Sequence, residues 1–532
     1  MWAAVIIGLA ALIQLLLAFQ PLNFLIANVL PDDAFYYFQI ARNIVAGDGS
    51  SFDGVNLTNG FHPLWLLINL PAFAWFPGEL WPIQFLLLIS VGLNLATALF
   101  LYRILSRFIE SKWLKNFLLA VYLFNPFVLL ETINGLETAL SLFFITLFIW
   151  WWLEVSGRPT TRNFVIAGVV GGLMMLARLD NIFFFAAFLL WIVATGSAKL
   201  FPVREGKSQL VTISRFILCS SLVAVVVIFP WVIWNWLTFG MISTSAANTA
   251  SLVTHGLVTQ DNGGGWLVFV KTIVYMLELN WQTVSTMTSA PWFWIGTAGA
   301  IIYWWWQRSV KFNQSFFVQP LPFVLGGWLA MFIANAGLRW VGRSWYFVGF
   351  NLVAVILLAW WLGQAGKVDR SRLSLSVREQ AVNFSRLALI PIVIFLLIFS
   401  YALDFKREIL NRYQPQLAMV EAAEWGNENL PTGSVIGVFN AGVQGYLSRH
   451  RVVNLDGLVN NTAAAAIKDR QLWAYTQNEV GYFSDFPIYL DYRYRSFLGA
   501  SNPLVDLDWL ATVGTATELY GQTDGLQIFR LK

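Results

Sequence analysis

Two adjacent carboxylates, Asp32 and Asp33, directly follow the first apolar segment of the chain. Either one could accept a proton from a hydroxyl, and the pair could bind a cation. The structural alternative is a cap, because an aspartate ahead of AFYYFQIARNIVAG can cap the helix that this stretch predicts. One aspartate is enough for a cap. Two adjacent carboxylates near a low-dielectric boundary repel each other unless a cation, a donor or a substrate hydroxyl lies close by, so we favour a functional pair.

His62 and Glu137 are the next candidates, in the stretches NGFHPLW and NGLETAL. Because His62 precedes Pro63, its backbone is expected to be extended, at the start of a helix on the same side as the two aspartates. A lone histidine is more often a satisfied interface residue than a catalyst, but it titrates near neutral pH and stays a candidate for substrate contact. Glu137 opens an apolar helix, where a carboxylate can simply pair with the helix dipole. That alternative does not explain why Glu131 lies in the same short loop, also without a basic partner.

Two further stretches combine arginine with other polar residues. ARLDN holds Arg178 and Asp180 in a tight hairpin, where they could form only a local ion pair or where Asp180 could contact substrate. LRWVGRSWYF places Arg339 and Arg343 four residues apart, a spacing that predicts one face of a helix. Because arginine binds phosphate in a bidentate manner, we interpret this pair as a phosphate clamp.

These candidates lie in a very apolar chain. Of its 532 residues, 58% are hydrophobic and 12% are charged, and the mean hydropathy is +0.62, which is outside the range of soluble globular proteins. A membrane-crossing helix needs about 17 to 25 apolar residues. Windows that approach this length lie near residues 3–20, 82–103, 116–131, 138–153, 163–178, 181–198, 216–236, 291–306, 317–336, 345–363 and 387–403. The sequence thus predicts a polytopic α-helical membrane protein with about eleven transmembrane helices.

The distribution of basic residues predicts the orientation. With the N-terminus inside, the inner loops hold 17 lysines and arginines and the outer loops hold five, as expected when basic loops stay cytoplasmic. This arrangement places the C-terminus outside. It also requires that the apolar segments 63–76 and 266–280 do not cross, so we expect helices lying on or dipping into the outer face. The candidate acids and arginines then share the outer side of a plasma membrane.

The residues after 403 predict a separate extracytoplasmic α/β domain, 404–532. GSVIGVFNAGVQGYLSRH predicts a strand, a glycine turn and a helix, RVVNLDGL a second strand, and TELYGQTDGLQIFRL a hairpin. Its glycines do not form a dinucleotide fingerprint, and we assign Gly442 and Gly445 to close strand-to-helix packing. The single cysteine, Cys219, excludes an internal disulfide. The net charge of +4 reflects mainly the inner loops and gives no reason to expect a nucleic-acid partner.

The stretches DDAFYYFQIARNIVAGDG, NGFHPLW, NGLETAL and LARLD, with FG followed by ANTA, together resemble membrane glycosyltransferases of the GT-C superfamily. The likeness extends in order through the membrane region, and it is closest to the bacterial branch that uses polyprenyl-phosphate sugars, including arabinofuranosyl, mannosyl and family 39 transferases. The resemblance implies a catalytic domain over 1–403, with the catalytic acid in the first outer loop, 31–81, and its juxtamembrane helices. The acid role carries onto Asp32 and Asp33, and a substrate-holding role onto Glu137.

The resemblance and the residues agree on one chemistry. A carboxylate takes the proton of an acceptor hydroxyl while a lipid phosphate leaves the sugar, which predicts inversion if the displacement is single. His62, Asp180, Arg339 and Arg343 are the further candidates for substrate binding. A divalent cation such as Mg²⁺ or Mn²⁺, held by Asp32, Asp33 and Glu137, could replace the arginines in stabilising the leaving phosphate, and the sequence leaves both possibilities open.

The expected partners are a polyprenyl-phosphate-linked sugar, a glycan, lipid or protein acceptor, and the lipids of a prokaryotic plasma membrane. Two rival functions use the same residues. A lipid or solute transporter, or a flippase, could also coordinate an ion or headgroup with outer acids and arginines, but no paired broken helices in two symmetric halves are visible. A non-catalytic scaffold that displays the tail would leave the two aspartates unexplained.

Overall fold

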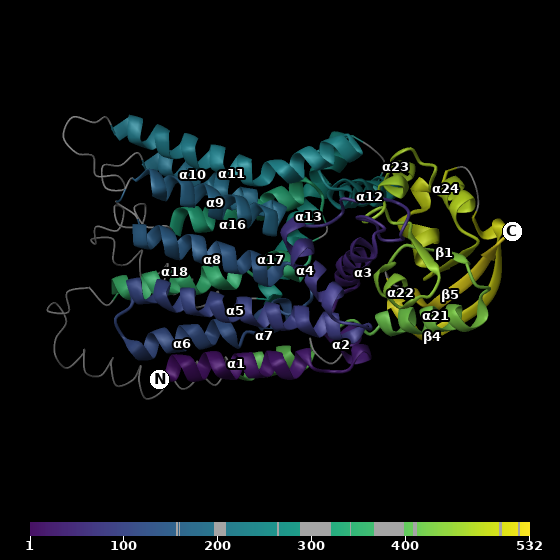
Figure 1. Cartoon of the computed structure of the whole chain (residues 1–532), viewed down its shortest axis with the longest axis horizontal. Coiled ribbons are helices and arrows are strands. Elements are labelled where there is room, and N and C mark those ends of the chain that lie inside the picture. Colours follow the sequence, from purple (N-terminus) through teal and green to yellow (C-terminus); the bar gives the residue numbers. More distant parts are fainter. Residues whose placement is uncertain are drawn as a thin grey trace.

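The protein is a long helical bundle with a small sheet domain at one end (Figure 1). The structure, a computed structural model, describes residues 1–155, 158, 160–195, 209–262, 265–287, 321–340, 342–365, 398–407, 412–499, 503–519 and 522–532. The expected span 291–306 and most of the expected span 387–403 lie outside these residues. The chain begins at the end of the bundle that is farthest from the sheet domain.

The helices of the bundle run along its long axis (Figure 1). They are α1 (Trp2–Ala18), α5 (Leu80–Phe108), α6 (Lys112–Leu123), α8 (Thr138–Val155), α9 (Thr161–Ala177), α10 (Ile182–Thr195), α11 (Gln209–Phe239), α16 (Leu321–Gly337) and α18 (Phe350–Ala365). Among the described residues, four helices are long and apolar enough to cross a membrane, or five if α1 and the sharply bent α2 (Leu22–Asn28) form one span. Four more apolar helices are shorter.

The window 116–131 is not the single helix that the sequence predicts. Helix α6 ends at Leu123, and a separate short helix, α7 (Pro126–Glu131), follows. Asn125 caps α7, because its side-chain oxygen accepts hydrogen bonds from the backbone N–H groups of Phe127 and Val128. Pro126 at the first helical position has no N–H to continue the preceding helix. Hydropathy alone therefore joins two helices that local capping separates.

Four helices lie between the bundle and the sheet domain or beside that boundary (Figure 1). They are α3 (Asp32–Ala46), α4 (Pro63–Trp75), α12 (Ser245–Asn262) and α13 (Trp266–Met287). The segments 63–76 and 266–280 are thus helical, as expected. At 13 residues α4 is too short to span a bilayer, and α13 is not apolar enough to count as a span.

The C-terminal tail, residues 412–532, holds a five-stranded sheet in the order β2-β1-β3-β5-β4. Its strands are β1 (Val435–Val438), β2 (Arg451–Asn454), β3 (Tyr482–Asp485), β4 (Leu507–Leu519) and β5 (Gln522–Leu531). Strand β1 pairs in parallel with β2 and β3, whereas β4 and β5 form the expected antiparallel pair. The helices α21 (Gln416–Asn429), α22 (Gly442–Leu447), α23 (Asn461–Lys468) and α24 (Leu472–Glu479) accompany the sheet.

The tail shares its hydrophobic core with the first juxtamembrane helices. Phe35 and Phe38 of α3 make edge contacts with Tyr446 of α22, and Phe52 lies within the same continuous cluster. Arg42 of α3 donates to the backbone oxygen of Tyr446 and covers the Tyr446 ring at 3.9 Å. A shared apolar core resists separation of the two parts, since separation would expose this surface to water. The tail is therefore fixed against α3.

The two tail glycines serve this contact and not packing inside the tail. A β-carbon on Gly442 would overlap the backbone oxygen of Asp32, and one on Gly445 would overlap the ring of Phe52. The expectation of close strand-to-helix packing at these positions is therefore corrected: the close approach is between α22 and the first loop region. A side chain at either position would push the tail away from α3.

Gly442→Ala is expected to loosen the tail. Overpacking of a fixed contact costs about 1–3 kcal/mol, so the detergent-purified variant should melt at a lower temperature than the wild type. Gly481→Ala in the same domain is the matched control, because a β-carbon there meets no atom within 4 Å. Equal melting temperatures for the two variants would contradict the close contact at Asp32.

Candidate active site

A cavity of about 910 Å³ lies where the bundle, the juxtamembrane helices and the tail meet. One part of its lining is polar and comes from α3, the segment before α17 (Ser344–Phe347), and the tail. Another part is apolar and comes from α9, α10 and α11, including Met175, Phe183, Ile228 and Trp231. The cavity thus joins a charged region to an apolar region formed by helices of the bundle.

Asp32 is used to dock the tail. Its carboxylate accepts hydrogen bonds from the backbone N–H groups of Val443 at 2.7 Å and Gly442 at 3.1 Å, and its own N–H donates to Gln416 Oε1 at 2.7 Å. Burial raises the pKa of Asp32 to about 7, against the lowering effect of the Val443 N–H. Neither aspartate caps its own helix, since the N-cap position of α3 is Pro31.

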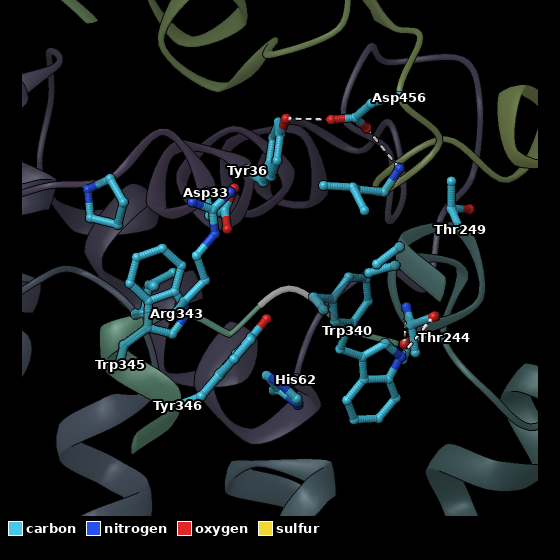
Figure 2. A pocket seen from close by; sticks show the side chains of 18 of the residues that line it. Asp33, Tyr36, His62, Thr244, Thr249, Trp340, Arg343, Trp345, Tyr346 and Asp456 are labelled. Atoms are coloured by element: carbon cyan, nitrogen blue, oxygen red, sulfur yellow. Dashed lines mark hydrogen bonds between the residues drawn. The ribbon is translucent and has the colours of Figure 1, made fainter. Parts of the chain in front are cut away.

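Asp33 faces the cavity instead (Figure 2). Within the described part of the chain its carboxylate makes no hydrogen bond or ion pair. Burial raises the pKa of Asp33 above its ordinary value, while the positive charges of Arg343 and Arg493 lower it and Glu137 raises it. The Arg343 side chain extends toward Asp33 in Figure 2. Asp33 is therefore the aspartate of the pair that is open to a bound molecule.

Glu137 lies at the centre of a buried polar cluster. Its carboxylate accepts from the Tyr37 hydroxyl at 3.0 Å, and it lies 3.5 Å from His62 Nε2 and 3.8 Å from Arg178 Nε. His62 Nδ1 accepts the N–H of Leu179 at 3.1 Å, which leaves the ring proton on Nε2, toward Glu137. The cluster joins four separate segments of the chain, and Glu137 has the partners that its own loop lacks.

Asp180 and Arg178 form the local ion pair that their hairpin allows, with 3.1 Å between Arg178 Nε and Asp180 Oδ1. The angle of this contact does not make a hydrogen bond. Arg178 also donates to the backbone oxygen of Trp345 at 2.8 Å and lies over the Tyr346 ring. The hairpin is the short helix η1 (Leu179–Asn181), and Asp180 contributes to the cavity lining.

Glu131 does not line the cavity; its fully buried carboxylate forms an ion pair with Arg412, which is at the start of the tail and is 7% exposed. Arg412 also donates to Ser344 Oγ at 2.9 Å, and Asn134 donates to the second Glu131 oxygen at 2.8 Å. The partner missing from the Glu131 loop is thus supplied from 281 residues away.

Arg339 and Arg343 do not lie on one helical face, so that expectation is wrong. Helix α16 ends at Gly337, and Arg339 has a left-handed backbone with φ of 59°. Arg343 is extended and precedes α17. Arg343 lines the cavity, whereas Arg339 does not. Because α16 ends before Arg339 and α17 begins after Arg343, the helical spacing argument does not apply. The second cation near Asp33 is Arg493 of the tail.

Asp32, Asp33 and Glu137 do not converge on one metal position. Among the residues that the structure describes, no group of three or more His, Cys, Asp and Glu side chains is arranged to hold a metal ion. The reason is visible in their partners, because Asp32 accepts N–H groups of the tail and Glu137 is held by Tyr37, His62 and Arg178.

Sequence reasoning missed the tail residues of the cavity. Asn440, Asp456, Tyr489 and Arg493 all line it. The Tyr36 hydroxyl of α3 donates to Asp456 Oδ2 at 3.2 Å (Figure 2). A signal for Asp456 existed, since NLDG places an acid and a glycine directly after a buried strand. No comparable signal marks Arg493.

Comparisons with known proteins place the fold. No curated protein matches the chain, and residues 407–517 match a family described only as a domain of unknown function, DUF8728. The chain resembles the crystal structure of the Archaeoglobus fulgidus oligosaccharyltransferase with zinc and sulfate, at 15% identity and a TM-score of 0.55, covering 96% of this chain and 72% of the other. A second structure of that protein, tethered to an acceptor peptide with the NVT sequon, gives 14% identity, a TM-score of 0.54 and coverages of 98% and 74%.

The mycobacterial arabinofuranosyltransferase AftD also matches, at 15% identity over 99% of this chain and 41% of AftD, but its TM-score of 0.41 is too low to support an argument. At these identities the archaeal likeness establishes the fold alone. The chain shares the fold of that archaeal protein, and its apolar helices make it a multi-pass membrane protein.

The buried Glu131–Arg412 pair is expected to stabilise the junction of bundle and tail. Glu131→Gln leaves the Arg412 charge buried, which costs about 3–5 kcal/mol, and adding Arg412→Gln should recover part of the loss. Glu154→Gln is the control, because its pair with Arg107 is nearly half exposed and such pairs contribute less than about 1 kcal/mol. Thermal unfolding of the wild type and the three variants tests this. Equal effects of Glu131→Gln and Glu154→Gln would show that the buried pair is not needed.

Proposed function

We propose that this protein is a membrane glycosyltransferase that moves a sugar from a polyprenyl phosphate to an acceptor hydroxyl, at the outer face of a prokaryotic plasma membrane. The observation that carries the proposal is one cavity in which Asp33 and Arg343 stand beside each other and an apolar arm leads into the bundle. A carboxylate, a phosphate-binding cation and a lipid-compatible wall are the three parts that such a transfer requires. The GT-C fold supports the same function.

The donor fits the two regions of the cavity. Its polyprenyl chain would lie along the apolar residues of α9, α10 and α11, where burial of apolar surface is favourable. Its phosphate would lie at Arg343, whose guanidinium can form two parallel hydrogen bonds to phosphate oxygens. Trp345 and Tyr346, which also line this part of the cavity, limit access of water to the phosphate. Arg493 adds a second positive charge from the tail.

The reaction is a single displacement. Asp33 takes the proton of the acceptor hydroxyl as its oxygen bonds to the sugar C1, and the bond from C1 to the phosphate oxygen breaks. The lipid phosphate leaves with that electron pair, stabilised by Arg343. The configuration at C1 inverts, and protonated Asp33 then releases its proton to solvent. The acceptor is a hydroxyl of an envelope glycan, lipid or protein.

The adjacent Asp32 acts as a positioning residue. Through Val443 and Gly442 it ties the first turn of α3 to the tail, and this turn carries Asp33. The Glu137 cluster fixes α3 from the other side through Tyr37. In this proposal His62, Asp180 and Glu137 hold the cavity wall, which all three line.

Asp33→Asn is expected to reduce turnover by about 10²- to 10⁴-fold, the usual contribution of a positioned base, while binding of the lipid phosphate is retained. The measurement follows cleavage of a radiolabelled pool of polyprenyl-phosphate sugars in membranes that supply acceptors. Asp48→Asn, an exposed acid after the same helix, is the control and should react like the wild type. Wild-type turnover by Asp33→Asn would reject Asp33 as the base.

The pH dependence of the activity is expected to reflect the ionisation of Asp33. Only its ionised form accepts a proton, so activity is expected to rise with pH through the pKa of Asp33, at a pH above the ordinary aspartate value of 3.8. Arg343 lowers this pKa, so Arg343→Gln should move the acidic limb of the kcat/KM profile to higher pH, besides weakening donor binding.

Arg449→Gln, at an exposed position in the tail, should leave that acidic limb in place. A limb that does not move in Arg343→Gln would mean that another group controls the profile.

A further inference from the structure

The loop after β2 is held unusually firmly against the membrane part of the protein. Asn454 accepts the backbone N–H groups of Gly457 and Val459, which closes the loop on itself. From α12, Ser245 donates to the oxygen of Leu458 at 2.8 Å and Thr249 to the oxygen of Gly457 at 3.3 Å. These contacts fix the position of the one acid in the loop, Asp456.

The first outer loop is shaped to receive this segment. A β-carbon on Gly60, in NGFHPLW, would overlap the backbone oxygen of Leu458. Asn59 next to it accepts hydrogen bonds from the backbone of Ser245 and from the side chain of Asn461. Two segments far apart in the sequence, the first outer loop and α12, thus converge on the loop, and each contacts its backbone or its immediate neighbours.

Burying the carboxylate of Asp456 in this loop costs free energy. Its side chain is only 3% exposed, and it accepts from the Tyr36 hydroxyl and from the Leu458 N–H at 2.8 Å. Within the described ranges it forms no ion pair. Burial raises its pKa to about 7. An asparagine would keep both contacts without a charge to bury, because its oxygen can accept the Leu458 N–H and its amide NH2 can donate to the Tyr36 hydroxyl. The fold therefore does not require a carboxylate at this position. We take this as an indication that the Asp456 carboxylate interacts with a bound molecule.

The surrounding cavity wall has the composition of a sugar-binding surface. Arg493 acts electrostatically on both Asp456 and Asp33, and it lies over the rings of Tyr489 and Tyr494. Phe439 stacks on Tyr494 with 4.3 Å between ring centroids, so these rings are fixed. Asn440 donates to the Tyr489 hydroxyl.

A sugar ring matches this surface because hydroxyl groups alternate with apolar C–H faces around it. Carboxylate, amide and guanidinium groups bind the hydroxyls, and the aromatic rings offer apolar faces to the C–H groups.

We propose that the tail binds the acceptor and that the acceptor is a carbohydrate, with one sugar hydroxyl donating to Asp456 and the ring lying against Tyr489 and Tyr494. This inference rests on the proposed function, because it assigns the acceptor side of the same cavity. The donor phosphate would then lie against the wall formed by α17 and its preceding residues, and the acceptor ring against the wall formed by the tail. The two would meet at Asp33.

The test separates acceptor binding from donor binding. The purified full-length protein is given polyprenyl-phosphate sugar and, in parallel, a set of oligosaccharides and a set of hydroxyl-bearing peptides. Asp456→Asn keeps the Tyr36 and Leu458 contacts, and it is expected to raise KM for the oligosaccharide by about tenfold or more, as when a hydrogen bond that a site is built to make is lost. KM for the donor and hydrolysis of the donor by water should not change. Glu428→Gln, an exposed acid of the tail, is the control.

A second measurement does not depend on catalysis. Saturation-transfer NMR should show oligosaccharide binding to the wild type without donor, and weaker binding to Asp456→Asn and Asn440→Ala. Equal changes in donor and acceptor KM, no change in either, or transfer to peptides and not to oligosaccharides would each overturn the inference.

The two proposals fail in different ways. A wild type that neither transfers nor hydrolyses any donor would reject the proposed transferase. Even then, oligosaccharide binding that depends on Asp456 would establish the carbohydrate surface. If the wild type also bound no oligosaccharide, that surface would be rejected as well.

Discussion

The hydrogen bonds from the backbone of Gly442 and Val443 to Asp32 join the tail to the start of α3, and the geometry of the cavity depends on this junction. Gln416 completes it by accepting from Asp32 and donating to the oxygens of Ile26 and Leu30. Because Asp33 is the next residue, any shift of the tail would move it relative to Arg343. The cavity is thus a property of the assembled bundle and tail, and neither part encloses it alone.

The helical geometry explains why two adjacent aspartates take different places. Consecutive residues of an α-helix point about 100° apart, so when Asp32 faces the tail, Asp33 is directed to another side and lines the cavity. The sequence shows that the pair is unusual, but it contains no information on which surface lies on which side of α3. That distinction needs the position of α22, which is some 410 residues further along the chain.

Local patterns predicted much of the architecture. The tail strands, the helix after Pro63 and most apolar helices follow from periodicity and from the fixed geometry of proline. Most of the failures concern contacts that cross the chain, whereas the helix break after Leu123 and the left-handed backbone of Arg339 are local. Glu131 lacks a cation nearby and finds one in Arg412, and the clamp expected from Arg339 and Arg343 fails because Arg339 is left-handed. Asp456 and Arg493 reach the cavity only after the tail has docked.

The most direct test of the account is a structure of the protein with a non-hydrolysable polyprenyl-phosphate sugar analogue. We expect the phosphate beside Arg343, the sugar C1 facing Asp33, and the lipid chain along α9, α10 and α11. An analogue bound elsewhere, or a phosphate placed away from both Arg343 and Asp33, would contradict the assignment of this cavity as the site of transfer.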